Sequence, residues 1–455
     1  MSERIFLVHG WSVSDTRTYQ ALHLKLAEKD FEIENVYLGR YVSLDDRVEV
    51  KDLADAMQRA LTKSLGKPPW NKPFHIITHS TGALITKEWI LNHYIENYSA
   101  NRPLGNVIFL AGPHFGSRLA HHGRSMIAHI KFLGDTGNKI LTALELGSQF
   151  SWENNGSWLK EDVWRKKSIR PYCLIGDKVS GSFFAKKIFS AGFEAGSDMV
   201  VRVPAANLNF QRFRLDALTN KITKLGRVRG VPFVVLDQYT HSGAKLGIMN
   251  SIKKNADPEL PKFEHLNLIL QCLRVKTDTA YQKVLKQFSQ ITARNRGRKS
   301  KRKYISRPFA QIDFRFVDHT AAPIEDYSFT LGYYHAGREH PSEIVKHIHK
   351  NKVTPHHLTA FLDMRKFAPE LRYFMKFDSS SGTNLFSYVP DPYKIDIEGK
   401  SLVDIICEDQ ATQIEIALGR TSSEKLFIFH PGTDKDLHLS WNRQGDIGDR
   451  KLPIK

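Results

Sequence analysis

The stretch Lys72–Gly82, KPFHIITHSTG, joins a short apolar run to a polar corner that holds a single serine. Phe74–Ile77 has the apolar, β-rich composition of a buried strand, and the helical apolar spacing of Ala83–Tyr98 begins directly after the corner. A tight turn of this kind pushes a side chain out of the sheet, where the first amide groups of the helix face developing negative charge. The context predicts that Ser80 is a catalytic nucleophile, and the alternative is that it only caps the helix.

The corner matches the usual nucleophile pattern, G-x-S-x-G, only in part. Thr78 occupies the first small position and Gly82 the second, and a bare S-x-G is common by chance. A serine hydroxyl is also a weak nucleophile, which needs a base, a group that orients the base, and donors for the oxyanion. The prediction for Ser80 therefore depends on whether the rest of the chain supplies these groups.

The first 275 residues alternate between strand-like and helix-like segments. Such alternation implies a largely parallel sheet covered by helices. The expected strands include Arg4–Val8, Phe31–Leu38, Phe74–Ile77, Asn106–Ala111, Arg170–Ile175 and Gly230–Leu236, and the expected helices include Tyr19–Lys29, Val50–Leu65 and Ala83–Tyr98.

The alternation lapses in residues 116–164, a helix-prone stretch with large apolar residues. An insertion of this length in a compact domain is typical of a lid or a binding element. The alternative is that its apolar side chains cap the core of the sheet. These side chains are Phe132, Leu133, Phe150, Trp152 and Trp158.

A second pattern begins after the basic stretch 292–303, TARNRGRKSKRK, which has seven Lys and Arg residues. Short alternating runs separated by turn residues follow it, and they predict an antiparallel β-sandwich. The expected division is an α/β catalytic domain at 1–290, with a mainly parallel sheet and a helical lid insertion at 116–164, a basic linker at 291–308, and a C-terminal β-sandwich domain at 309–455.

Three residues far apart in the sequence are candidates for the catalytic machinery. Ser80, Asp198 and His241 each lie on a turn or loop that follows an expected strand, so all three would lie at the carboxyl edge of one parallel sheet, where ligands bind in such folds. His241 would take the Ser80 proton, and Asp198 would hold the imidazole tautomer and stabilise its charged form. Asp177 also ends a strand and is the alternative acid, whereas Asp237 is expected to be a turn residue.

Several stretches of the first 275 residues occur in an order that is informative: IFLVHGW (5–11), the corner itself, LAGPHFGSRLA (110–120), PYCLIGD (171–177), GSDMVVRVP (196–204) and YTHSG (239–243). With them, residues from Arg4 to about Leu273 resemble the α/β-hydrolase superfamily, in particular serine lipases and esterases of the bacterial lipase and phospholipase type with a C-terminal β domain. The resemblance implies an ester hydrolase with a Ser-Asp-His triad. It also implies that the oxyanion accepts hydrogen bonds from the amide of Trp11, after the His-Gly turn at Gly10, and from the amide of Thr81.

The other histidines are expected to have supporting roles. His9 and His79 would support the oxyanion turn and the nucleophile corner through hydrogen bonds, and His114 would pack nearby. His347 and His349 diverge if they lie in a helix, so we expect them at the surface. The three cysteines of the chain are too widely spaced for a zinc site or a disulfide framework. We therefore expect no metal and no cofactor.

The chain carries 66 Lys and Arg against 48 Asp and Glu, a net charge of +18. This excess favours anionic partners, such as the surface of an acidic membrane or nucleic acid. Together with the apolar insertion and the resemblance, it favours a lipase or phospholipase that cleaves acyl esters of lipids. One alternative is a carboxylesterase or thioesterase for small soluble esters. Another is a nucleic-acid-binding or interaction protein, although the basic stretch lacks the interleaved aromatic residues of nucleic-acid modules.

The N-terminal sequence, MSERIFLVHGW, enters an expected strand without the charged and then apolar pattern of a cleaved signal peptide. We therefore expect synthesis in the cytoplasm. Combined with the resemblance to membrane-active hydrolases, this expectation leads to the hypothesis of an antibacterial effector that is exported by a non-Sec secretion system. An intracellular lipase or esterase is the alternative.

Overall fold

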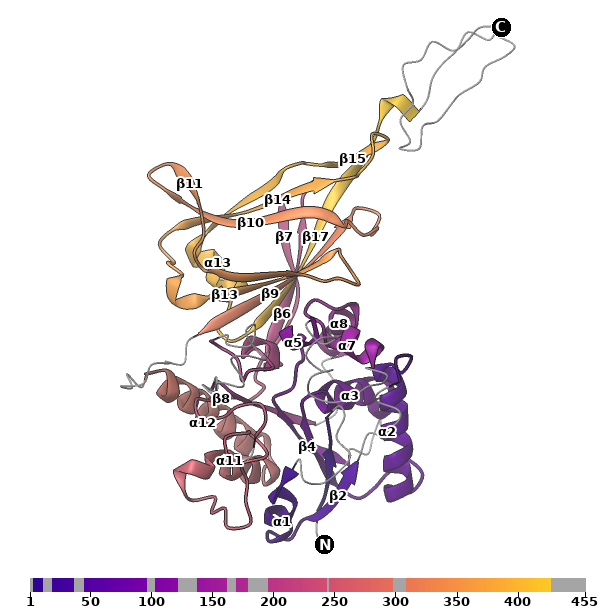
Figure 1. Ribbon diagram of the computed structural model, residues 1–455, viewed down its shortest axis with the longest axis vertical. Coiled ribbons are helices and arrows are strands. Elements are labelled where there is room, and N and C mark those ends of the chain that lie inside the picture. The colour runs from indigo at the N-terminus through magenta and orange to yellow at the C-terminus, as the bar shows by residue number, and fades with distance from the viewer. Residues whose placement is uncertain are drawn as a thin grey trace, which may run out of the picture.

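The computed structural model describes residues 3–10, 19–36, 45–95, 103–121, 137–161, 169–178, 195–243, 245–297 and 308–426. These residues form an α/β part and a β part, and the β part stands on one end of the α/β part (Figure 1). We call the described residues within 3–209 and 229–297 the α/β domain, and residues 210–228 and 308–426 the β domain.

A parallel sheet of six strands forms the centre of the α/β domain. Its strands are short and apolar, and all six residues of the strand before Ser80 are buried. Parallel strands are buried in this way because helices cover both faces of the sheet. The strand order is β2 (Glu32–Val36), β1 (Arg4–Val8), β3 (Phe74–His79), β4 (Leu104–Leu110), β5 (Arg170–Gly176) and β8 (Phe233–Leu236).

The helices form where apolar residues recur at helical spacing. The helix Val50–Leu65 buries Leu53, Met57 and Leu61 on one stripe and begins with a capping box between Glu49 and Asp52. The helices are α1 (Leu22–Ala27), α2 (Val50–Leu65), α3 (Gly82–Trp89) with its π-helical continuation η2 (Ile90–Tyr94), α5 (Arg118–His121), α7 (Asn138–Leu144), α8 (Gln149–Glu161), α11 (Glu264–Leu273) and α12 (Asp278–Gly297), with 3-10 turns at η3 (Pro204–Ala206) and η4 (Pro261–Phe263).

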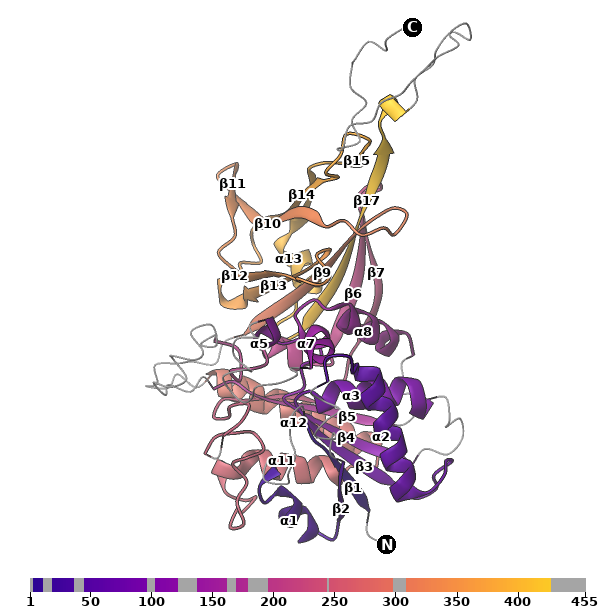
Figure 2. The ribbon, with the colours of Figure 1, turned by 45° about the vertical axis from the view of Figure 1, so that its right-hand side comes forward.

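Helices α2 and α3 lie on one face of the sheet, and α1, α11 and α12 lie on the other (Figures 1 and 2). The carboxyl ends of the strands point toward the β domain, since β3 leads into the start of α3 on that side. The predicted α/β-hydrolase fold is confirmed, and the sheet edge expected to hold the site is the edge next to the β domain.

The β domain consists of two sheets that pack face to face around an aromatic core, which includes Phe314, Phe316, Phe329 and Phe377. The larger sheet has the order β12 (Val345–Lys350), β13 (His357–Asp363), β9 (Phe309–Asp318), β17 (Ala411–Ser422), β6 (Phe210–Asp216) and β7 (Lys221–Val228), with β15 (Phe386–Val389) on β17. The smaller sheet has the order β11 (Arg338–Pro341), β10 (Asp326–His335), β14 (Arg372–Ser380) and β16 (Tyr393–Glu398), and the remaining elements are α13 (Gly399–Ile405), η5 (Met364–Lys366) and η6 (Glu424–Leu426).

The boundary between the domains differs from the expected division at residue 290. The hairpin β6–β7 comes from the first half of the chain, yet β6 pairs in parallel with β17 of the β domain. The larger sheet is therefore mixed, because β17 is also parallel to β9. Residues 291–297, expected in the linker, continue α12, where Arg296 forms an ion pair with Asp409.

The described part of the 116–164 insertion lies between the two domains (Figure 1). Trp152 and Trp158 are buried, and Phe150 packs against the core of the α/β domain. The Arg212 guanidinium of β6 lies 4.6 Å over the Trp152 ring. These apolar side chains therefore act as packing in this part of the insertion, while Phe132 and Leu133 lie outside the described residues.

His347 and His349 were expected at the surface on the assumption of a helix, and for His349 this is wrong. Both lie on the strand β12, where residues two apart share a face. That face turns toward the α/β domain, so His349 is buried and its Nε2 lies 3.0 Å from the Glu145 carboxylate.

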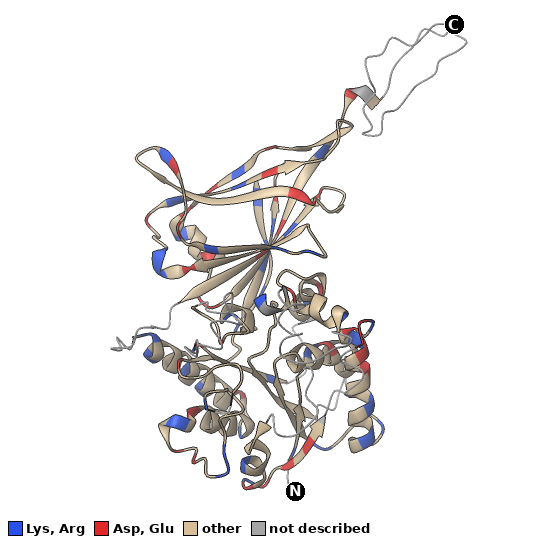
Figure 3. Cartoon of the chain, viewed as in Figure 1, with Lys and Arg blue, Asp and Glu red and all other residues tan. Residues whose placement is uncertain are grey.

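Lys and Arg residues are spread along both domains, with Asp and Glu residues among them (Figure 3). Within the described residues, no helix is both long enough and apolar enough to span a membrane. The same residues contain no cluster of three or more His, Cys, Asp or Glu side chains placed to hold a metal.

Candidate active site

The chain makes a strained corner between β3 and α3. Ser80 has a φ of 56°, in the left-handed region that a residue with a side chain seldom adopts. Its amide donates a hydrogen bond to the Leu110 carbonyl of the neighbouring strand, at 3.1 Å. This conformation turns the Ser80 side chain away from the buried strand, and the residue is half-buried where its neighbours are buried.

Two glycines allow the corner to approach the end of β1. A Cβ atom on Gly82 would lie 2.6 Å from Thr78 Oγ1 and 2.9 Å from the Val8 carbonyl oxygen. A Cβ atom on Gly10 would lie 3.2 Å from Ser80 Cβ. The Thr78 side chain thus fills the space beside Gly82, so the corner forms although the first glycine of the usual pattern is absent.

Ser80, Asp198 and His241 meet at the carboxyl edge of the sheet. His241 Nε2 lies 3.0 Å from Ser80 Oγ, and His241 Nδ1 lies 2.8 Å from Asp198 Oδ2. Asp198 is fully buried and the His241 residue is 8% exposed. A carboxylate that accepts from Nδ1–H leaves Nε2 free to accept the serine proton, which is the geometry of general-base catalysis.

The loop of Asp198 fixes its carboxylate from several sides. Asp198 Oδ1 accepts hydrogen bonds from the amides of Val200, at 3.0 Å, and Val201, at 2.7 Å. The His241 amide donates to the Asp198 carbonyl oxygen at 2.9 Å, so the loops of Asp198 and His241 are joined directly. The alternative acid, Asp177, directly follows β5, where its backbone amide donates to the Leu236 carbonyl oxygen, and the Asp237 carboxylate accepts from the side-chain amide of Gln238.

His79 supports the His241 loop. Its Nε2 lies 3.2 Å from the His241 carbonyl oxygen, and the two rings are 4.7 Å apart. Burial, and then the charge of His241, hold the pKa of His79 well below its usual value, so the ring is neutral and can donate from Nε2. His9 contacts Asn35 through Nε2 at 3.2 Å and packs edge-on against Tyr19.

The three residues predicted for the oxyanion site have different outcomes. Thr81 is the N-cap of α3, where the first amides of a helix have no intrahelical acceptor. Gly10 lies against Ser80, as described above. Trp11 lies outside the described residues. The amide of Thr81 is therefore next to Ser80, and its role as an oxyanion donor stays a prediction.

A buried cluster beneath the corner was missed in the sequence. Lys87, on α3, is fully buried, and its ammonium group donates to Asn155 Oδ1 and lies 5.5 Å over the Trp158 ring. The Asn155 amide donates in turn to the His114 carbonyl oxygen at 2.9 Å. Burial lowers the pKa of Lys87 to about 7. The available signal was its helical position, since Lys87 follows Ala83 by four residues on the apolar stripe.

Replacing Lys87 with methionine is expected to stabilise the protein at pH 6.5. The unfolded chain has a lysine pKa near 10.5, so it takes up a proton between pH 10.5 and 7 that the folded protein does not. The free energy of unfolding therefore falls as pH drops through this window, by several kcal/mol at about 1.36 kcal/mol per pH unit. The methionine variant avoids this loss of stability, but it also loses the hydrogen bond to Asn155, which lowers its free energy of unfolding by about 1–3 kcal/mol.

Thermal melts at pH 6.5 and pH 9.5 measure this effect. The variant should melt higher than wild type at pH 6.5, and the difference should shrink or reverse at pH 9.5. Lys63→Met, at an exposed position of α2, is the matched control and should change neither value. An equal difference at the two pH values would show that Lys87 carries no such titration.

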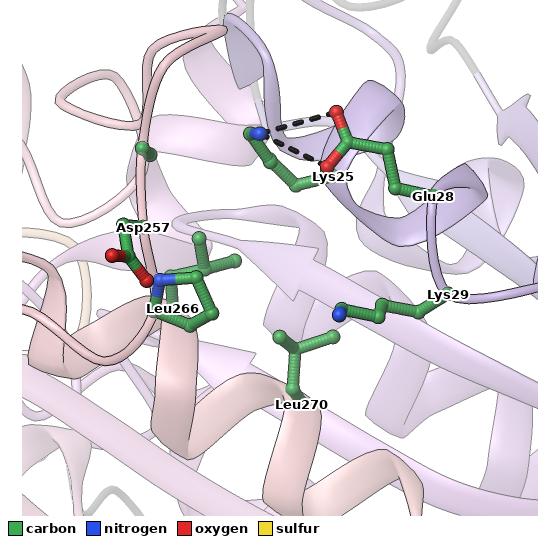
Figure 4. A pocket seen from close by; sticks show the side chains of 8 residues that line it. Lys25, Glu28, Lys29, Asp257, Leu266 and Leu270 are labelled. Carbon is green, nitrogen blue, oxygen red and sulfur yellow. Dashed lines mark hydrogen bonds and ion pairs between the residues drawn. The ribbon is translucent and has the colours of Figure 1, made fainter.

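A separate pocket of about 200 Å³ lies between α1 and α11 (Figure 4). Lys25, which is paired with Glu28, and Lys29 lie on one side of it, and Leu266 and Leu270 lie on the other. The pocket is not lined by Ser80, Asp198 or His241, so it is distinct from the candidate active site.

Comparison with known proteins gives two solved structures that are similar over nearly the whole chain. Phospholipase PlaB from Legionella pneumophila has 29% sequence identity and a TM-score of 0.82, with 96% of this chain and 98% of that chain covered. The same protein in complex with thio-NAD gives 27% identity and a TM-score of 0.81, with 95% and 97% covered. The sequence matches no family model and no curated protein.

The similarity to PlaB includes both the α/β domain and the β domain, because almost all of each chain is aligned. A parallel sheet with a strained serine corner, and with a histidine and an aspartate next to that serine at the carboxyl edge, is the arrangement of the α/β-hydrolases. The chain has the α/β-hydrolase fold and is a carboxylic ester hydrolase, similar to phospholipase PlaB over almost its whole length.

Proposed function

We propose that this enzyme is a serine lipase or phospholipase, which cleaves acyl esters of membrane lipids with Ser80 as nucleophile, His241 as base and Asp198 as the acid that orients the base. The observation that carries the proposal is the double contact of His241, with Ser80 Oγ at 3.0 Å and Asp198 Oδ2 at 2.8 Å. The similarity to PlaB, which is a phospholipase, supports a phospholipid as substrate.

The reaction has two steps. His241 Nε2 accepts the Ser80 proton while Oγ attacks the ester carbonyl, and the negative charge that forms on the carbonyl oxygen is stabilised by the amide of Thr81 and by that of Trp11. The tetrahedral intermediate collapses, and the protonated imidazole gives its proton to the departing alcohol oxygen. Water, activated by the same imidazole, then attacks the acyl-enzyme and releases the fatty acid.

The basic character of the chain supports a membrane surface as partner. The net charge of +18 would attract anionic lipid, and each Lys or Arg near such a surface contributes about 1 kcal/mol. The hypothesis of an exported antibacterial effector stays a prediction, as do the small-ester and nucleic-acid alternatives. Of the basic stretch 292–303, Arg294 and Arg296 are engaged in ion pairs within the fold, which argues against nucleic-acid binding by this part.

The test is product analysis from phospholipid vesicles. Vesicles of phosphatidylcholine, with and without phosphatidylglycerol, are incubated with wild type and with Ser80→Ala. Wild type should release fatty acid and lysophospholipid, faster when the anionic lipid is present, and the variant should release neither. Cleavage of nitrophenyl acetate and butyrate without cleavage of any phospholipid would favour the small-ester alternative instead.

A further inference from the structure

The loop that carries Asp198 is a tight hairpin at residues 196–203. The Val203 amide donates to the Gly196 carbonyl oxygen at 2.8 Å, and the Asp198 amide donates to the Val201 carbonyl oxygen at 3.1 Å. Met199, at the tip, has a φ of 86°, which is strained for a residue with a side chain. A strained tip persists only where its surroundings hold it, so the contacts of this loop decide where the carboxylate lies.

The base of the loop is pressed against the β domain. Gly196 lies so close to Phe309 of β9 that a Cβ atom on it would be 2.2 Å from the Phe309 ring. Phe309 is stacked in turn on Phe361 of β13, with ring centroids 4.6 Å apart. The first residue of the hairpin thus rests on an aromatic pair that belongs to the β domain.

Arg202, on the returning side of the hairpin, extends into the same surface. Its side chain is 1% exposed, its guanidinium lies 4.1 Å over the Phe361 ring, and its Nη2 donates to His347 Nδ1 at 3.1 Å. A buried guanidinium is costly unless it is well partnered, and the His347 imidazole and the Phe361 ring that it contacts belong to β12 and β13.

A buried carboxyl group of the β domain, that of Asp313, interacts electrostatically with Arg202. Asp313, on β9, accepts hydrogen bonds from Thr359, at 2.7 Å, and Gln311, at 3.0 Å. Burial raises the pKa of Asp313 to about 7, and the two hydrogen bonds and the Arg202 charge act against that rise. The β domain thus provides ring, imidazole and carboxyl groups around one side chain of the acid loop.

The other side of the loop is connected to the β domain through the insertion. Ser117 Oγ donates to the Val200 carbonyl oxygen at 2.6 Å, and the Ser117 amide donates to Leu144 at 2.7 Å. The next residue, Glu145, is buried against His349 of β12. The acid loop is therefore held on both sides by contacts that lead to the same strand.

We propose that the β domain is part of the catalytic apparatus, because it positions Asp198 against His241 through Arg202 and Phe361. This inference rests on the proposed function, since it assigns Asp198 the role of the acid. Arg202 and Phe361 are positioning residues: they do not touch the reacting atoms, and they act through the hairpin that carries the carboxylate. A displacement of such a group by about 1 Å reduces the rate about 10²-fold.

The experiment compares Arg202→Met, Arg202→Lys and Phe361→Leu with wild type on a soluble nitrophenyl ester over pH 5 to 9. Arg202→Met should lower kcat about 10–100-fold with little change in KM. In the profile of kcat against pH, the acidic limb of this variant should lie at lower pH than that of wild type, because a misplaced Asp198 stabilises the His241 imidazolium less. Arg202→Lys should recover part of the rate, since it keeps the charge and loses the flat stacking group.

Phe377→Leu is the matched control, because Phe377 is as buried as Phe361 but lies in the core between the two sheets of the β domain. It should lower the melting temperature without moving the pH profile. The proposal is overturned if Arg202→Met or Phe361→Leu lowers the melting temperature while the acidic limb stays in place, or if Phe377→Leu shifts that limb equally. Absence of hydrolysis in wild type, or full activity of Ser80→Ala, would instead overturn the proposed function.

Discussion

Replacing Ser80 with alanine is expected to reduce ester hydrolysis about 10⁶-fold and to leave the fold intact. Alanine has no hydroxyl, so His241 has no proton to accept and no acyl-enzyme forms. The hydroxyl contributes one contact, to His241, and the strained φ of 56° is shared by both residues. The folding cost of the substitution is therefore small. Turnover of a nitrophenyl ester and the melting temperature together measure the two effects.

The control for this variant is Ser289→Ala, at an exposed position of α12 where the hydroxyl bonds only to the preceding turn. It should retain full activity. Residual activity of the Ser80 variant near 1% of wild type, in protein purified away from other esterases, would contradict the role of Ser80, because base and oxyanion donors alone do not support such a rate.

The α/β fold and the site at the carboxyl edge of its sheet could be predicted from the sequence because the signals for strands and helices are local. The apolar run Phe74–Ile77 and the helix that follows Gly82 are read within one window of the chain, and the structure has both. The hairpin β6–β7 was not assigned to the β domain for the opposite reason. Its alternating pattern identifies a strand, but its partner is Ala411–Ala417, about 200 residues away, and no local pattern specifies that pairing.

The same distinction applies to the candidate site. Ser80, Asp198 and His241 could be selected because each follows a strand, and strand ends of a parallel sheet converge. Arg202 could not, because its importance comes from a distant neighbour, Phe361. For Lys87 the helical position on the apolar stripe of α3 indicates burial, but its partner Asn155 lies on a distant segment that no local pattern specifies.

Replacing Asp198 with asparagine is expected to lower kcat about 10⁴-fold, and the reason is visible in its hydrogen bonds. Asp198 Oδ1 accepts from the amides of Val200 and Val201, at 3.0 and 2.7 Å. In the variant the amide oxygen must take that position, since the NH₂ group cannot accept from two N–H donors. The NH₂ group then points at His241 Nδ1.

A donor facing Nδ1 selects the imidazole tautomer that carries its proton on Nε2. That nitrogen, 3.0 Å from Ser80 Oγ, would donate to the serine and could not take its proton, so the base is lost while the geometry remains. Asp177→Asn and Asp237→Asn test the alternative acids and should change kcat less than about 10-fold, because neither can alter the tautomer. A larger loss in Asp177→Asn than in Asp198→Asn would transfer the role of the acid to β5.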